Sequence, residues 1–188
     1  MEKKLDFRVQ RTYKTLQDAL IRLLREKRFE EITVGELCET AMIRRATFYK
    51  HFGDKYELFS FTVREFLKHF NSQGGVDYDL SDPQSFYTGM VDYTLRFVEQ
   101  NEDIFQSLMK SNNAQILFDI LSNEVERDIG EHLKEDVKNG VNLPARTDLM
   151  ASIFTGALIY TVKWWIVHDK QLPREELVQV CSSMMKFL

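Results

Sequence analysis

The chain has 188 residues, of which only 8 are glycine and 3 are proline, roughly half the combined share of an average protein. So few turn-forming residues exclude a β-sandwich, barrel or propeller, and 44% hydrophobic with 29% charged residues excludes a disordered or fibrous chain. A net charge of −4, taken over the whole chain, argues against a nucleic-acid partner. The composition predicts an all-α fold, and the periodicity described below divides it into about nine helices.

The sequence carries no sign of a disulfide framework, a metal site or a leader. Cys38 and Cys181 lie far apart and outside any Cys-x-x-Cys motif. The basic N-terminus is not followed by an apolar segment, so we expect no signal peptide. Residues 150–167 approach the length of a membrane span, but Lys163 and three hydroxyl side chains favour a buried helix. We therefore expect a cytoplasmic protein with no cofactor, no metal and no membrane partner.

Helical periodicity begins near the N-terminus. An amphipathic helix is predicted over residues 8–27 from apolar residues at helical spacing, namely Leu16, Leu20, Leu23 and Leu24. Thr33 and Glu36 then form a capping box, in which each side chain satisfies a free backbone amide of the other residue. The capping box predicts the start of a short second helix.

The remaining helices are separated by clear breaks. The polar stretch 71–82 contains Gly74-Gly75 and is a predicted loop, and Asp82-Pro83 is typical of a helix start. The predicted helices after the second one cover residues 45–51, 55–71, 83–100, 102–111, 113–139, 147–169 and 174–187.

The second and third predicted helices, which are both short, have the spacing of a helix-turn-helix motif. In this motif the second helix of the pair enters the DNA major groove. Phe48 and Phe52 are four residues apart and can share a buried face. The rest of the helix is basic and hydroxylated, and no acidic residue occurs from Met42 to Gly53. Such a surface suits contacts to phosphates, with base edges read near the helix start.

The stretch from Ile32 to Leu58 closely resembles the DNA-binding domain of the tetracycline-repressor (TetR/AcrR) family. The specific part is Thr47-Phe-Tyr-x-His-Phe52, followed by Lys55 and Leu58. The resemblance implies a homodimeric transcriptional regulator, usually a repressor, that binds a palindromic operator in double-stranded DNA. Residues 1–56 would form the helix-turn-helix domain, and residues 57–188 a helical domain that dimerises and often holds an inducer.

Matched positions imply roles for individual residues. Arg45 and Thr47 would approach bases, whereas Thr33 would touch the DNA backbone. Phosphates would be held by four further residues: Tyr49, Lys50, His51 and Lys55. The sequence departs from the family at Met42, where a glycine suited to positive φ is usual, and at Arg44, where a serine or threonine commonly caps the helix. Arg44 is therefore itself a DNA-binding candidate.

Aromatic residues are concentrated in the C-terminal part, where they could line an apolar effector pocket or form ordinary core. A small apolar or aromatic effector is expected if the pocket exists. The candidates for its lining are Met90, Tyr93, Phe97, Phe105, Phe118, Tyr160 and Trp164.

The last two predicted helices are the expected dimer interface. Small residues around Gly156 permit close helix approach, and two copies of the pair would form a four-helix interface about a two-fold axis. The predicted interface residues are Phe154, Ala157, Leu158, Trp165, Leu177, Val180, Cys181 and Met184.

Other functions remain as alternatives. The regulator could respond to a protein partner instead of a small molecule, or the chain could be an interaction protein that does not bind DNA. An enzyme is not expected, because the sequence has no glycine-rich phosphate loop, HExxH motif or nucleophile elbow.

The charge is unevenly distributed along the chain. Residues 1–56 contain 13 Lys and Arg against 9 Asp and Glu, whereas residues 57–188 contain 12 against 20. The overall −4 therefore averages a basic N-terminal part and an acidic remainder, and it does not exclude nucleic acid after all.

Overall fold

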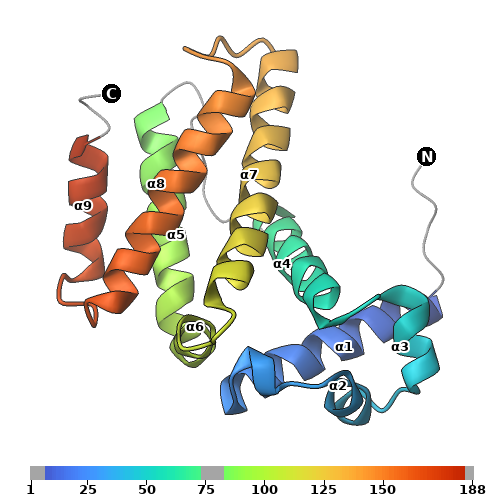
Figure 1. Ribbon diagram of the computed structural model, residues 1–188. Coiled ribbons are helices and arrows are strands. Elements are labelled where there is room, and N and C mark those ends of the chain that lie inside the picture. The colour runs from blue at the N-terminus through green and yellow to red at the C-terminus, as the bar shows by residue number, and fades with distance from the viewer. Residues whose placement is uncertain (1–6, 73–82, 185–188) are drawn as a thin grey trace. The chain divides into compact units, whose positions relative to one another are not determined.

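The computed structural model describes residues 7–72 and 83–184, and every regular element within these ranges is helical (Figure 1). The predicted all-α architecture is confirmed. The elements are α1 (Phe7–Glu26), the 3₁₀-helix η1 (Phe29–Glu31), α2 (Val34–Thr40), α3 (Arg45–His51), α4 (Lys55–Ser72), α5 (Pro83–Gln100), α6 (Glu102–Met109), α7 (Ala114–Lys138), α8 (Thr147–Val167) and α9 (Arg174–Met184).

The chain forms two compact units, and each is discontinuous in sequence. Unit 1 comprises Met1–Glu65 and Asp103–Ile120, and unit 2 comprises Phe66–Glu102 and Leu121–Leu188. Unit 1 thus contains α1 to α3, the first part of α4, nearly all of α6 and the start of α7. The functional division after residue 56 stays a prediction.

Unit 1 is built around one hydrophobic core. The apolar stripe of α1 predicted from the sequence is buried, and Leu16 and Leu20 are fully enclosed. Leu108 of α6 and Leu117 of α7 belong to the same core cluster. Each fully buried leucine or phenylalanine contributes about 1.5–3 kcal/mol to folding. The three helices α1 to α3 therefore pack on a core that includes residues from the middle of the chain.

Polar contacts also join α6 and the start of α7 to the segment after α1. Ser107 Oγ donates to the Lys27 carbonyl at 2.8 Å, and the Glu30 carboxylate accepts from Ser111 Oγ at 2.5 Å and from the Asn112 amide at 3.0 Å. The bond from the Asn112 amide, and then that from Ser111, lowers the pKa of Glu30. Glu30 therefore favours its charged form where it binds the residues just before α7.

Unit 2 is a helical bundle in which α5 packs against both α8 and α9 (Figure 1). Arg174 at the start of α9 forms ion pairs with Asp92 at 3.0 Å and Glu99 at 3.4 Å, both on α5. Trp165 is buried, and its Nε1 donates to the Leu172 carbonyl at 2.8 Å. The ion pairs of Arg174 thus join α9 to α5, and the Trp165 hydrogen bond holds the connection between α8 and α9.

Among the described residues, α8 is the one helix long and apolar enough to cross a membrane. One such helix is weak evidence for a membrane span, because the core helix of a soluble protein has the same composition. Eight of the side chains of α8 are buried inside the protein, including Phe154 and Trp165. The helix therefore packs as a core helix, as the sequence predicted.

Several helix boundaries differ from the predicted ones by one or two residues; α6, for example, ends at Met109 and not at residue 111. Helix α8 ends at Val167 because Asp169 and Lys170 adopt left-handed backbone conformations, with φ of 49° and 53°. The 3₁₀-helix η1 lies where no helix was predicted, since three residues are too few to show a periodic pattern. Residues 73–82 of the predicted loop and residues 185–187 of the last predicted helix lie outside the described residues.

Candidate nucleic-acid interface

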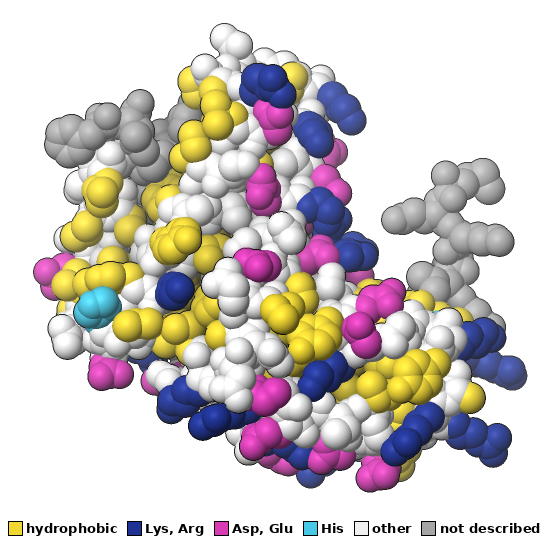
Figure 2. Space-filling model, viewed as in Figure 1, with side chains coloured by type: hydrophobic (Ala, Val, Ile, Leu, Met, Phe, Trp, Pro, Cys, Tyr) yellow, Lys and Arg dark blue, Asp and Glu magenta, His cyan; other side chains and the backbone are white. Residues whose placement is uncertain are grey.

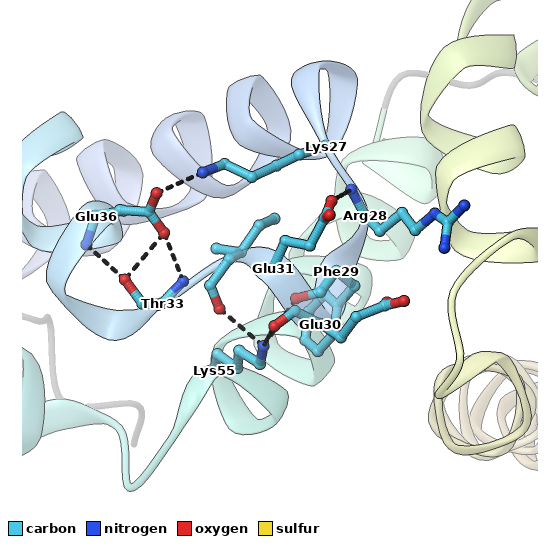
Figure 3. Close-up of polar contacts among 9 residues, drawn as sticks. Lys27, Arg28, Phe29, Glu30, Glu31, Thr33, Glu36 and Lys55 are labelled. Atoms are coloured by element: carbon cyan, nitrogen blue, oxygen red, sulfur yellow. Dashed lines mark hydrogen bonds and ion pairs between the residues drawn. The ribbon is translucent and has the colours of Figure 1, made fainter.

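The start of α2 has the capping box that the sequence predicted (Figure 3). The Glu36 amide donates to Thr33 Oγ1 at 3.2 Å, and the Thr33 amide donates to Glu36 Oε2 at 2.9 Å. Lys27 also binds the Glu36 carboxylate, which the sequence pattern did not reveal. The Lys27 contact, followed by the bonds from Thr33, lowers the pKa of Glu36 to about 2.

The turn between α2 and α3 contains Met42 in a left-handed conformation, with φ of 53°. This is the conformation expected at a position where the family usually has glycine, and it costs a residue with a Cβ about 1–2 kcal/mol. The Met42 amide donates to the Glu39 carbonyl at 3.1 Å, and the Ile43 amide donates to the Cys38 carbonyl at 2.9 Å. Met42 is 92% exposed, so burial of its side chain does not offset the cost.

Helix α3 has one buried face and one exposed basic face. Phe48 and Phe52 are buried as predicted, whereas Tyr49 is 58% exposed and is therefore not a core tyrosine. Arg44, Arg45 and Lys50 are also exposed. In the view of Figure 2, Lys and Arg side chains gather over the part of the surface formed by α1 and α3. The geometry leaves this face open to a large anionic partner.

Thr47 and His51 are half-buried at the edges of the same helix. The His51 ring packs edge-on against Tyr13 of α1, with ring centroids 5.2 Å apart. Arg44 occupies the N-cap position of α3 and makes no side-chain capping bond, as expected from its departure from the family pattern. The position of α3 therefore depends on its aromatic contacts and not on a cap.

Lys55 has a different role from the predicted one. Its Nζ donates to the carbonyls of Phe29, Ile32 and Glu30 at 2.8, 2.7 and 3.1 Å (Figure 3). These bonds use all three ammonium donors, so none is left for the phosphate that we expected Lys55 to hold. Burial lowers the pKa of Lys55, and the nearby carboxylates of Glu30 and Glu36 oppose that shift.

The second and third amides of α4 are occupied as well. Asp54 Oδ1 accepts from the amides of Tyr56 and Glu57 at 2.8 and 2.9 Å. The Glu57 carboxylate in turn accepts from the Gly53 amide at 2.6 Å. The start of α4 is thus capped by the carboxylate of Asp54.

The residues predicted to line an effector pocket are not all in one unit. Phe105 and Phe118 belong to unit 1, whereas Met90, Tyr93 and Phe97 belong to unit 2. Tyr160 and Trp164, also of unit 2, are 71% and 43% exposed and do not line its interior. An effector pocket stays a prediction, and these last two residues belong to a surface.

The predicted dimer residues also divide into two groups. Five of them are buried within the chain, namely Phe154, Leu158, Trp165, Leu177 and Cys181. Val180 and Met184 are exposed, and Ala157 is half-buried. The outward side of α8 instead carries exposed apolar residues that the prediction omitted or assigned to the pocket: Leu149, Ile153, Tyr160, Trp164 and Val167.

Comparison with known proteins identifies the family. Residues 16–60 match the description "Bacterial regulatory proteins, tetR family", and residues 87–187 match "Transcriptional regulator C-terminal region". The second match covers more than half of the chain. The chain belongs to the TetR family. It is therefore a DNA-binding transcriptional regulator, and the family is not one of enzymes.

Several proteins of known structure share the fold. The Listeria innocua protein Lin0861 is 21% identical, with a TM-score of 0.71 over 100% of this chain and 96% of its own. A TetR transcriptional regulator from Streptococcus agalactiae is 24% identical, with a TM-score of 0.59 over 94% of each chain. FadR from Bacillus subtilis, solved in complex with stearoyl-CoA, is 17% identical, with a TM-score of 0.58 over 93% of this chain and 96% of its own.

A closer sequence match covers a short stretch of the chain. The HTH-type transcriptional regulator YxbF from Bacillus subtilis is 45% identical over 58 residues, which are 30% of this chain and 15% of that protein. The α2–α3 pair is thus the helix-turn-helix of a TetR-family protein. The assignment of individual side chains to bases and phosphates stays a prediction.

The two lysines predicted to hold phosphates should now behave differently. Lys55→Met removes one donor from each of three carbonyls, and we expect it to lower the free energy of unfolding by about 1–3 kcal/mol. Lys50→Met, on the exposed face of α3, should change stability by less than about 0.5 kcal/mol and should reduce the salt dependence of DNA binding by about one counterion. Urea unfolding and fluorescence anisotropy measure the two effects. The structural role given to Lys55 would be contradicted if Lys55→Met unfolded at the same urea concentration as the wild type and weakened DNA binding as Lys50→Met does.

The low pKa of Glu36 predicts a specific dependence of stability on acid. Because its pKa is about 2 in the folded protein against an ordinary 4.5, the unfolded chain binds more protons between these values. The stabilisation is complete above the higher value and is lost as the pH falls towards the lower one. Urea unfolding at several acidic pH values should show a shallower loss of stability for Glu36→Gln than for the wild type. Glu26→Gln, in an exposed pair with Arg22, is the control and should follow the wild type.

Proposed function

We propose that this protein is a homodimeric repressor that binds a palindromic operator and releases it when an effector binds to the C-terminal part. The observation that carries the proposal is the exposed basic face of α3, whose other face is held in the core by Phe48 and Phe52. A helix fixed on one side and cationic on the other has the form required to enter the major groove.

The DNA contacts follow from the position of each residue on α3. Arg44, Arg45 and Thr47 at its start would reach base edges, and Tyr49, Lys50 and His51 would bind phosphates. Thr33, at the exposed start of α2, would approach the DNA backbone. Lys55 is left out of this set because its donors are used within unit 1.

The exposed apolar residues of α8 and α9 support a homodimer. Ile153, Tyr160 and Trp164 recur at helical spacing on the outward side of α8, and Val180 and Met184 are exposed on α9. Figure 2 shows hydrophobic side chains at the surface over these two helices. An exposed apolar surface of this kind is typical of a protein interface. A two-fold dimer would use the same surface on both copies and match the symmetry of a palindrome.

An elongated apolar effector fits two further observations. One relative of the same fold was solved in complex with stearoyl-CoA. In unit 2, the buried atoms Thr155 Oγ1 and Asp136 Oδ2 have no hydrogen-bond partner among the described residues. Buried polar atoms without partners are unusual in proteins and suit the few polar contacts of an otherwise apolar pocket. An effector that binds the arrangement of the dimer unable to bind DNA better than the DNA-binding arrangement would shift the population away from the DNA-binding form.

We place the protein in the cytoplasm.

A binding-site selection from random double-stranded DNA tests the DNA-binding face. The wild type should enrich a palindromic sequence and bind it more weakly as salt increases. The double variant Tyr49→Ala/Lys50→Ala should lose most of the affinity for DNA, whereas the double variant Lys134→Ala/Lys138→Ala, on the exposed surface of α7, should not.

Addition of stearoyl-CoA to the complex of the wild type with DNA should release the DNA. If it does not, control by another effector or by a protein partner replaces this part of the proposal. Unchanged affinity of the Tyr49/Lys50 variant would refute the DNA contacts.

If the exposed apolar side of α8 forms the dimer interface, a charge introduced there should weaken the dimer. Ile153→Glu should convert the dimer to a monomer, because a carboxylate would be desolvated at the interface without a partner. Ile116→Glu on α7 is a matched control, since Ile116 and Ile153 are 48% and 49% exposed. Sedimentation velocity measures the oligomeric state of both variants. A dimer that persists in Ile153→Glu would remove α8 from the interface.

A further inference from the structure

Gly35, in the first turn of α2, has no side chain at a point where Arg45 of α3 makes a close approach. A Cβ placed on Gly35 would lie 2.4 Å from Arg45 Nη2 and 3.2 Å from Cζ. Real Cβ atoms do not come so close to other heavy atoms, so any other residue at this position would displace the guanidinium. Glycine is a poor helix former, and close approach of another group is a physical reason to find it inside a helix.

The Arg45 guanidinium lies against the backbone of Gly35 and is not drawn there by an ionic partner among the described residues. Within residues 7–72 and 83–184, no hydrogen bond or ion pair to its nitrogens is found, and the residue is exposed overall. Its charge is felt nearby at Cys38, where burial raises the thiol pKa and Arg45 opposes that increase. Arg45 thus lies across the start of α2 with its donors unused.

These observations bear on how the protein recognises sequence. An arginine side chain ordinarily samples many rotamers, and holding it in one of them reduces the entropy lost on binding. A planar guanidinium with free donors can bind N7 and O6 of guanine with two parallel hydrogen bonds, which is the commonest specific contact in the major groove. Arg45 is the first residue of α3, the part of such a helix that contacts base edges.

We propose that Gly35 is a specificity-determining position: the absence of a side chain there places the Arg45 guanidinium to read a guanine in each half of the operator. Gly35 is a positioning residue and acts on DNA through Arg45. The inference rests on the proposed DNA contacts of α3 and adds to them a residue on α2 that supplies no side chain of its own.

The test is Gly35→Ala. The group displaced by the new methyl is the far end of a flexible side chain, and alanine favours a helix more than glycine does, so we expect the variant to fold with unchanged thermal stability. Its affinity for the selected operator, relative to operators with the guanine replaced, should fall by about tenfold or more. Gly130→Ala is the control, because its Cβ would lie an ordinary 3.6 Å from that of Ala151 in unit 2.

A double-mutant cycle separates positioning from a general effect on folding. In an Arg45→Ala background, Gly35→Ala should not change base preference any further, since the group through which it acts is gone. Arg45→Lys should keep the salt dependence of binding but lose the guanine preference, because an ammonium lacks the two-pronged geometry. Equal effects of Gly35→Ala with and without Arg45 would overturn the inference.

The outcomes distinguish this inference from the proposal beneath it. A wild-type protein that selects no discrete DNA sequence overturns the proposed DNA contacts, and the role of Gly35 with them. A selective wild type whose guanine preference survives Gly35→Ala overturns the role of Gly35 alone.

Discussion

The ammonium of Lys55 contacts three carbonyls of the segment that connects α1 to α2, and the geometry of the helix-turn-helix depends on this contact. Within the segment, the Ile32 amide donates to the Phe29 carbonyl, whereas the carbonyls of Glu30 and Ile32 accept from Lys55 at the point where the chain turns. Lys55 is the first residue of α4, and only the three residues 52–54 separate α4 from α3. The same three bonds therefore fix the connection that enters the helix-turn-helix and the helix that leaves it.

The recognition helix has little stability of its own. It is seven residues long, is preceded by a left-handed Met42 and has no side-chain cap at Arg44. A helix of this length does not persist alone in water. Its position instead comes from burial of Phe48 and Phe52 and from the contact between His51 and Tyr13. Because these contacts lie on one side, the polar residues on the other are not needed for folding and are free to meet DNA.

Features carried by local sequence could be predicted, and features that depend on distant packing could not. The capping box at Thr33 and the buried pair Phe48 and Phe52 follow from spacing along one helix. The partners of Lys55 lie more than twenty residues away, and no local pattern specifies them. Helix α8 is apolar nearly all round, so its periodicity does not show which side faces inward. That is why Phe154 and Leu158 were assigned to the wrong side of it.

Unit 1 has a consequence for synthesis on the ribosome. Chains emerge N-terminus first and domains begin to fold as they appear, but part of the core of unit 1, including Leu108 and Leu117, is supplied by Asp103–Ile120. The first segment of unit 2 must therefore be synthesised before unit 1 can be completed. Until then, the growing chain exposes the apolar surface that these leucines cover, and Glu30 lacks its partners Ser111 and Asn112. The core of unit 1 can therefore be completed only after synthesis has passed the middle of the chain.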